Sequence, residues 1–200
     1  SRSWKFWLAQ NVELRRATWK TTFVKALVTP SVDEVVANSA PAAQSAQHLL
    51  GIPWEKLHVI PPSLGDAWHG APKSVRRQRQ GAHFIMVGNN SPRKQLHLGP
   101  ELLRNLDPDS RLTIFTDKDL GLEDLVKKHG LQDRCQVVLG HVMTPGDYDR
   151  ADALVHVSNA ESVPRVFLEA TARGCPVIAY EVAATADYAH KSVAQGAWQE

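Results

Sequence analysis

From His83 onward, short apolar runs rich in Val, Ile and Phe alternate with amphipathic stretches, and this alternation constrains the fold more than any other feature. Each run has about five residues, as expected for strands buried on both faces of a sheet. Strand alternating with helix predicts an α/β fold, a Rossmann-like parallel sheet flanked by helices. The expected strands are His83–Gly88, Arg111–Thr116, Cys135–Leu139, Ala153–Val157 and Pro176–Tyr180, and the expected helices are His97–Leu106, Leu122–His129, Pro145–Ala151 and Val163–Arg173.

The residues before His83 have a different organisation. Apolar residues between Trp4 and Leu27 recur at near-helical spacing and predict one long amphipathic helix. The segment 61–82 carries three prolines, three glycines and the run Arg76-Arg77-Gln78-Arg79, which is typical of an exposed connection between structural units. We expect residues 1–62 to be the end of a larger unit. Its predicted elements are a strand at Glu34–Asn38, a helix at Pro41–Leu50 closed by Gly51, and a strand at Leu57–Ile60.

Composition narrows the class of protein. The chain is 43% hydrophobic and 22% charged, with a net charge of +2, and mixed signs along most of its length do not indicate a nucleic-acid partner. No run of about 18 apolar residues is present, so nothing in the sequence predicts a membrane span. Cys135 and Cys175 stand forty positions apart without a CxxC pair. Two core thiols in a reducing compartment are therefore expected, which favours a cytoplasmic location.

Open parallel sheets bind ligands at the carboxyl ends of their strands, and the loop after the first strand is polar and basic there. Gly88 would let a ligand approach the backbone, while Asn89 and Asn90 offer hydrogen bonds. Arg93 and Lys94 place two cations suited to phosphate oxygens. A solvated loop with two surface charges fits the same residues.

The second candidate loop runs from Ser158 to Glu169. A helix predicted to begin at about Val163 or Pro164 would direct free backbone N–H groups, those around Val163–Arg165, toward a diphosphate. Glu161 precedes this cradle and Glu169 lies inside the helix, so two carboxylates could hold hydroxyl groups on either side of a diphosphate. The pair of glutamates alone is a weak motif; its place at a strand–loop–helix junction gives it weight.

Other familiar sites are absent from the sequence. It has no G-x-G-x-x-G, no G-x-x-x-x-G-K-[ST] and no G-x-S-x-G motif. His141 and His156 flank strand ends, and we interpret both as structural residues.

Taken in order, these segments resemble the retaining group 1 glycosyltransferases (family 4). Residues Glu161 to Ala179, which include the Gly174-Cys175-Pro176-Val177 closure, are similar to the donor-site signature of that family. The resemblance runs from about residue 32 to residue 180. Further matching segments are Glu34–Ser39, His58–Pro62, Val87–Lys94, Leu139–Val142 and Ala151–Ala153.

The resemblance implies a two-lobed GT-B fold. Residues 1–62 would be the C-terminal part of the N-terminal, acceptor-binding lobe, 63–82 the hinge, and 83–200 a nucleotide-sugar-binding lobe that is truncated at its C-terminus. The activity implied is transfer of a sugar from a nucleoside-diphosphate sugar to a saccharide, lipid-linked or other acceptor, with retention of configuration and without metal or cofactor. The sequence leaves the donor sugar, the base and the acceptor open.

The resemblance also assigns roles by position. Lys94 would contact the diphosphate and stabilise the leaving nucleoside diphosphate, with help from Arg93. Glu161 would hold the donor sugar and Glu169 the ribose hydroxyls. The remaining residues expected to bind the nucleotide sugar are Gly88, Asn89, Asn90, Val142, Val163, Pro164 and Arg165.

Three departures from the family pattern affect these expectations. Asn89 stands where the family usually has Arg, and Arg93 would have to compensate. Residues 181–187 replace a Gly-rich, acid-containing loop. Both lobes are incomplete, so we expect the fragment alone to be inactive.

Two rival functions and one rival location remain open at this stage. A nucleotide-sugar epimerase of similar architecture would bind the same donor, and a non-catalytic lobe would bind or scaffold without transfer. The basic, Trp-rich N-terminal helix could pack within its own lobe or rest peripherally on the inner face of a membrane.

Overall fold

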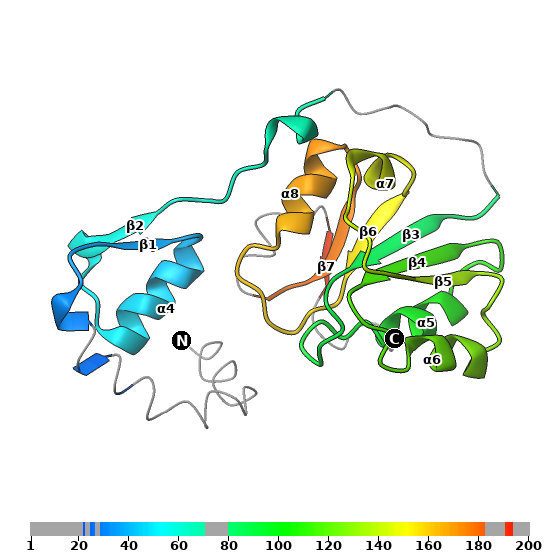
Figure 1. Ribbon diagram of the computed structural model, residues 1–200, viewed down its shortest axis with the longest axis horizontal. Helices are drawn as coiled ribbons and strands as arrows, with labels where there is room; N and C mark the ends of the chain where they lie inside the picture. Colours follow the sequence, from blue (N-terminus) through cyan, green and yellow to red (C-terminus); the bar gives the residue numbers. More distant parts are fainter. Residues whose placement is uncertain (1–21, 23–24, 27–28, 71–79, 183–190, 194–200) are drawn as a thin grey trace. The chain divides into compact units, whose positions relative to one another are not determined.

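The computed structural model describes residues 22, 25–26, 29–70, 80–182 and 191–193. The chain divides into two compact units, Ser1–Pro61 and Pro62–Glu200 (Figure 1). The long helix predicted between Trp4 and Leu27 falls almost entirely outside the described residues, as does most of the 181–187 loop.

The described part of the first unit is a strand–helix–strand segment. Strands β1 (Val35–Ala37) and β2 (Leu57–Val59) pair in parallel, and α4 (Ala40–Leu50) connects them. Ser39 caps α4, since its Oγ accepts a hydrogen bond from the Ala42 amide at 3.2 Å. Gly51, at φ 71°, ends the helix in the left-handed conformation that glycine tolerates best. The three elements predicted here are confirmed, within a residue or two at each end. One short 3₁₀ turn, Thr29–Ser31, precedes β1, and another, Trp54–Lys56, lies between α4 and β2.

The second unit is built on a six-stranded, wholly parallel sheet in the order β5-β4-β3-β6-β7-β8 (Figure 1). The five predicted strands and four predicted helices are all present, with shifts of no more than two residues at most of their ends. Strand β8 was not predicted. The strands are β3 (His83–Val87), β4 (Arg111–Thr116), β5 (Cys135–Leu139), β6 (Ala153–His156), β7 (Val177–Tyr180) and β8 (Lys191–Val193), and the helices are α5 (Leu98–Arg104), α6 (Leu122–Lys128), α7 (Pro145–Asp149) and α8 (Arg165–Ala172).

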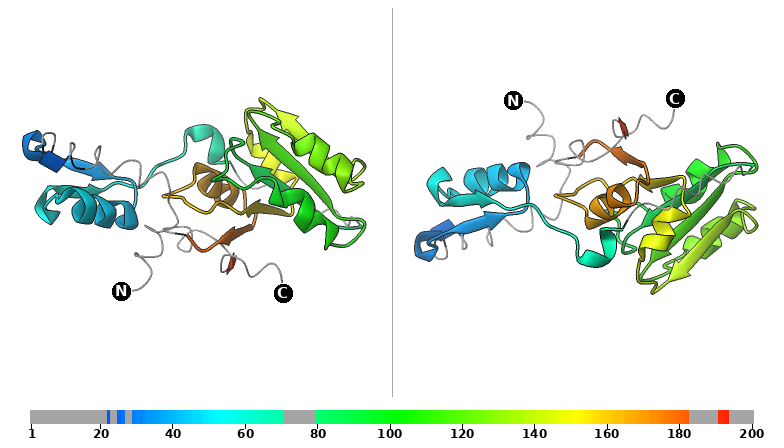
Figure 2. Two further views of the ribbon diagram at one scale, coloured as in Figure 1. Left: turned by 90° about the horizontal axis from the view of Figure 1, so that it is seen from below. Right: turned by 90° about the horizontal axis from the view of Figure 1, so that it is seen from above.

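Helices cover both faces of this sheet, which explains why its strands are apolar without strict alternation (Figures 1 and 2). Met86 faces the core under α5 and α6, where Leu103 and Val126 are buried. The preceding residue, Ile85, faces the opposite core, under α7 and α8, with Tyr148. Burial of each such large side chain contributes about 1.5–3 kcal/mol to folding.

The strand order reverses direction at β3. The chain builds outward from β3 through β4 to β5, and then returns to place β6 on the other side of β3. The carboxyl ends of β3 and β6 are therefore neighbours at the point where parallel α/β folds leave a crevice for ligands.

Part of the expected connection between the units packs on the second unit. The 3₁₀ turn Asp66–Trp68 brings the Trp68 ring edge-on to Tyr148, with ring centroids 5.6 Å apart. The carbonyl of Gly70 accepts a hydrogen bond from Arg173 Nη1 at 2.8 Å. Residues 62–70 are thus anchored to α7 and to the end of α8.

Two smaller expectations concern the thiols and the membrane. Cys135 and Cys175 are buried and free, which confirms the prediction of two core thiols. Burial raises the pKa of each thiol to about 11, so both are weak nucleophiles. Among the described helices, none has the length and apolar character needed to cross a membrane.

Candidate functional site

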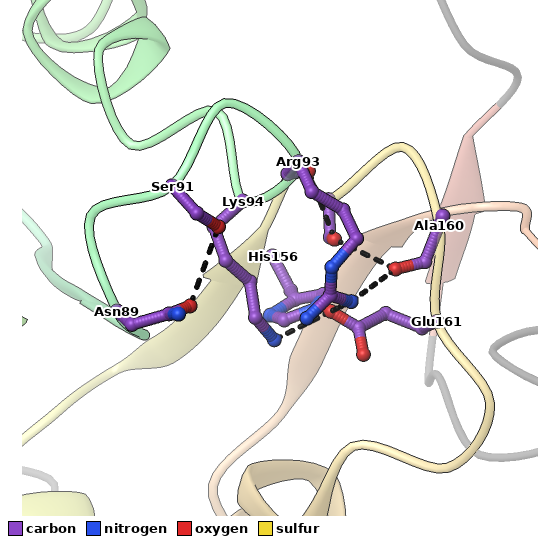
Figure 3. Close-up of polar contacts among 8 residues, drawn as sticks. Asn89, Ser91, Arg93, Lys94, His156, Ala160 and Glu161 are labelled. Atoms are coloured by element: carbon purple, nitrogen blue, oxygen red, sulfur yellow. Dashed lines mark hydrogen bonds and ion pairs between the residues drawn. The ribbon is translucent and has the colours of Figure 1, made fainter. Parts of the chain in front are cut away.

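The loops after β3 and β6 meet in a cluster of charged side chains (Figure 3). At its centre, Lys94 Nζ lies 2.5 Å from Glu161 Oε1. Only 14% of the Lys94 side chain and 8% of the Glu161 side chain are exposed. An ion pair this secluded is screened far less than a surface pair.

Lys94 owes its position to the residues just before and after it. A Cβ at Gly88 would lie 3.3 Å from Lys94 Cδ, so the absence of a side chain lets the lysine stem cross the end of β3. The Lys94 amide donates to the Ser91 carbonyl at 2.9 Å, closing the turn. Gln95 follows at φ 51°, an unfavourable conformation for a residue with a side chain. The strained residue, Gln95, is therefore the direct neighbour of Lys94.

Arg93 joins the two loops. Its Nη1 donates to the Ala160 carbonyl at 2.5 Å and lies 3.1 Å from Glu161 Oε1. Its own carbonyl accepts from the Asn159 amide at 3.0 Å and from Ser158 Oγ at 3.1 Å. Backbone and side chain of one residue therefore hold the β6 loop against the β3 loop.

His156, a structural residue in the sequence interpretation, is part of this cluster. It ends β6, is buried, and its Nε2 lies 3.2 Å from Glu161 Oε1. Its ring packs in a T-shaped arrangement with Phe167 on α8, with centroids 5.0 Å apart. Figure 3 shows Lys94, Arg93 and His156 approaching the same carboxylate. The sequence signal for it was its place at a strand end, five positions before Glu161.

The electrostatics of the cluster favour an added anion. Burial would raise the pKa of Glu161, but hydrogen bonds from His156 and Lys94 and the Lys94 charge hold that pKa well below its ordinary value. The pKa of His156 is lowered by burial, and the charges of Lys94 and Arg93 lower it further against the opposing effect of Glu161. His156 is therefore neutral at pH 7, and two cations face one carboxylate, leaving one positive charge in excess.

Glu169, the second predicted carboxylate, lies on the α7 side. It is buried on α8, and its Oε2 accepts a hydrogen bond from the Tyr148 hydroxyl at 2.7 Å. Arg165, one turn earlier, places Nη2 3.8 Å from the other oxygen, Oε1. Tyr148 was not among the residues that the sequence singled out.

The start of α8 differs slightly from its prediction. The helix begins at Arg165, and Pro164 is the extended residue that caps it, at φ −67° and ψ 121°. Val163 and Pro164 are buried ahead of the helix. Because proline has no N–H, the amides available at this helix start are those of Arg165 and Val166 rather than that of Pro164.

The other predicted residues lie at the same edge of the sheet with different surroundings. Asn90 links the β3 loop to the β4 loop: its amide N–H donates to Asp117 Oδ1 at 2.8 Å and its side chain donates to the Asp119 carbonyl at 2.5 Å. Asn89 is exposed and accepts from Ser91 Oγ at 3.4 Å. Val142, between β5 and α7, is 81% exposed. Roles for all three in nucleotide binding stay predictions.

Residues 71–199 match the family model of the glycosyl transferases group 1. The chain belongs to this family. The match covers most of the second unit, including both loops of the charged cluster. No curated protein matches the sequence at a significant level.

Solved structures similar to this group 1 glycosyl transferase chain confirm the fold. Anabaena HepE, solved in complex with UDP, is 20% identical with a TM-score of 0.76, over 90% of this chain and 55% of that one. WaaG, a glycosyltransferase involved in lipopolysaccharide biosynthesis, is 20% identical with a TM-score of 0.69, over 82% and 50%. A Rickettsia africae glycosyltransferase is 17% identical with a TM-score of 0.70, over 88% and 52%. The chain thus spans about half the length of these GT-B proteins.

Proposed function

We propose that this chain carries the donor site of a glycosyltransferase that moves a sugar from a nucleoside-diphosphate sugar to an acceptor with retention of configuration. The observation that supports it most is the buried Lys94–Glu161 pair, reinforced by Arg93, at the switch point of the parallel sheet. Such a crevice receives nucleotides in many α/β folds, and the excess positive charge suits a diphosphate.

Each charged residue has a task in this proposal. Lys94 and Arg93 bind the diphosphate and stabilise the negative charge that grows on it as the sugar–phosphate bond breaks. Glu161 accepts hydrogen bonds from hydroxyls of the donor sugar, and Glu169 from the ribose hydroxyls. The amides at the start of α8 add hydrogen-bond donors and a favourable dipole for phosphate oxygens.

The Lys94–Glu161 pair can bind the donor without breaking. Lys94 meets Glu161 Oε1 directly, and its ammonium has further N–H donors for a phosphate oxygen. His156 and Arg93 also contact Oε1 and keep the carboxylate in place. The cluster therefore holds the two main groups in register before the donor arrives, which lowers the cost of ordering them.

In this proposal, the transfer step needs no metal ion. The bond from the anomeric carbon to the diphosphate oxygen breaks, and the acceptor oxygen forms a bond to that carbon on the same face. The acceptor proton passes to the departing diphosphate. The two cations compensate the leaving charge, and the acceptor binds to the other lobe, as the family relationship implies.

The donor-site proposal is tested by a thermal-shift panel. UDP, GDP, ADP and TDP are added to the full chain, each with magnesium and with EDTA. We expect one diphosphate to raise the melting temperature selectively and equally in both conditions. Lys94→Ala and Glu169→Ala should lose the shift, whereas Lys128→Ala, an exposed lysine at the far end of α6, should keep it.

The outcomes separate the rival functions. A shift that survives Lys94→Ala would contradict the assignment of the diphosphate to this cluster. No shift with any of the four diphosphates would favour a lobe without a nucleotide role. In a transfer assay with an acceptor, NMR of the product anomer tests retention, and release of free sugar without an acceptor would indicate an epimerase instead.

A further inference from the structure

Glu169 accepts a buried hydrogen bond from a neighbouring helix. The Tyr148 hydroxyl donates to Glu169 Oε2 at 2.7 Å, from α7 to α8 across 21 positions of sequence. Only 1% of Tyr148 and 7% of Glu169 are exposed. The contact is therefore a buried, charge-assisted hydrogen bond, a strong class among those found in proteins.

The Tyr148 ring is fixed from several directions. Trp68 meets it edge-on at 5.6 Å and an interplanar angle of 68°. The next residue, Asp149, forms two hydrogen bonds of 2.9 Å with Arg173, which also donates to the Gly70 carbonyl at 2.8 Å. The segment containing Trp68 and Gly70 is thus held by Trp68 against α7 and by Gly70 against Arg173 at the end of α8. A ring with so little freedom directs its hydroxyl to one point.

The chemistry of the pair leaves Glu169 ready for two more donors. A tyrosine hydroxyl donates one hydrogen bond, and burial next to Glu169 raises its pKa, so it stays protonated and keeps donating. Each carboxylate oxygen accepts two hydrogen bonds. Tyr148 bonds Oε2 once, and Arg165 lies 3.8 Å from Oε1, beyond hydrogen-bond distance. Among the described residues, capacity therefore remains on both oxygens for a pair of neighbouring hydroxyls, and the orientation of the carboxylate is already fixed.

We propose that Tyr148 is a positioning residue that orients the Glu169 carboxylate toward the ribose 2′- and 3′-hydroxyls, and that Trp68 supports it in this role. This inference rests on the proposed function, because it needs a nucleotide in the site. It adds that the discrimination between ribose and 2′-deoxyribose depends on a hydroxyl that never touches the ligand. It also couples this discrimination to the packing of residues 62–70.

The test measures a ratio rather than an affinity. Dissociation constants of UDP, GDP and ADP, and of their 2′-deoxy forms, are determined by calorimetry on the full chain. For the diphosphate that binds best, we expect the ribose form to bind at least about tenfold more tightly than the deoxy form, because unpaired buried acceptors reject the analogue. Tyr148→Phe should reduce the ratio to about threefold or less, close to the value for Glu169→Gln.

Three further variants separate positioning from general damage. Trp68→Leu keeps the hydroxyl but removes its support, and should also lower the ratio. Lys94→Ala should weaken both forms equally and leave the ratio unchanged. Ser110→Ala removes a buried hydroxyl before β4, at the amino edge of the sheet, and should lower stability without altering the ratio.

Each outcome has one interpretation. A ratio preserved in Tyr148→Phe but lost in Glu169→Gln would overturn the positioning role and leave the donor site intact. A ratio preserved in Trp68→Leu would remove the link to residues 62–70. If the wild-type chain binds none of the six nucleotides, the proposed function fails and this inference fails with it.

Discussion

Lys94 Nζ and Glu161 Oε1 lie 2.5 Å apart, joining two loops that are separated by 67 positions in the sequence. The pair is largely buried, and Arg93 and His156 contact the same oxygen. Two hydrogen-bond donors, Lys94 and His156, and the guanidinium of Arg93 thus fix the orientation of the Glu161 carboxylate. The contacts that join the two loops therefore also orient Lys94 and Glu161 for a diphosphate and a sugar.

The pair should be energetically coupled. Lys94→Met and Glu161→Gln are each expected to lower the free energy of unfolding by about 1–3 kcal/mol, because each leaves a buried charge short of a partner. The double variant should lose less than the sum of the two, with a coupling of about 1 kcal/mol or more. Urea denaturation of the four proteins measures this. Purely additive losses would show that the pair contributes nothing beyond its separate residues.

His156 gives the stability of the protein a specific pH dependence. Its pKa in the folded state is lowered by burial and by Lys94 and Arg93, from an ordinary value of 6.5. The unfolded chain therefore binds more protons than the folded one as the pH falls through 6.5, so the free energy of unfolding decreases with falling pH in this window. Above it, the contribution is fully present.

His156→Gln isolates this contribution. Between about pH 8 and pH 5, the free energy of unfolding should fall less in the variant than in the wild type. The slopes of the two curves should differ by at most about 1.4 kcal/mol per pH unit, the value for one proton. The pKa of Glu161 is also lowered, but its protonation affects stability only below its ordinary pKa of 4.5, in a separate pH range. Identical pH profiles in urea denaturation would contradict the account of His156.

The sheet was predictable from sequence because its strands are buried on both faces. Arg111–Thr116 and Cys135–Leu139 match their predicted bounds, since an apolar run between turn signals leaves little choice. The start of α8 was less predictable. Pro164 could open the helix or cap it, and its extended ψ of 121° makes it the cap. Strand β8 was not predicted, because its three residues, Lys191–Val193, carry no apolar pattern.

The strained residue Gln95 yields a stabilising substitution. It adopts φ 51°, and its Oε1 is buried without a hydrogen-bond partner in the described part of the chain. Gln95→Gly should raise the free energy of unfolding by about 1 kcal/mol. It removes the backbone strain and the unpaired buried oxygen, and these two gains exceed the loss from the higher conformational entropy of glycine in the unfolded chain. Leu120→Gly is the matched control: φ is 40° there but the side chain is 73% exposed, so a smaller gain is expected. A loss of stability in Gln95→Gly by thermal denaturation would refute the strain argument.

Gly81, ahead of β3, has no room for a side chain. Its φ is 75°, and a Cβ would lie 2.1 Å from the Asp109 carbonyl oxygen, which is backbone and cannot swing away. Gly81→Ala should cost about 3 kcal/mol or more, by combining strain with overlap. Gly130→Ala has a similar φ of 66° with open space around it, and should cost about 1 kcal/mol. Equal losses in the two variants would contradict the role of the contact with Asp109.

For the site, the sequence predicts the positions of single residues but not the contacts between them. Lys94 and Glu161 could each be placed at a strand end, but their contact depends on β3 and β6 being neighbours, which only the strand order decides. The sequence places His156 at a strand end, but only the structure shows its contact with Glu161. Tyr148 lay inside a predicted helix, and its partner Glu169 follows 21 positions later with no spacing signal to connect them.

The central claim is that Lys94 and its neighbours bind a diphosphate. It is tested most directly by comparing, in the same calorimetric titration, the diphosphate and the monophosphate of the nucleoside that the chain prefers. We predict that the wild type and Lys128→Ala bind the diphosphate at least about tenfold more tightly, because the second phosphate reaches the secluded ammonium of Lys94. Lys94→Ala should reduce this preference to about threefold or less. An undiminished preference in Lys94→Ala, or none in the wild type, would contradict the assignment of the donor diphosphate to this cluster.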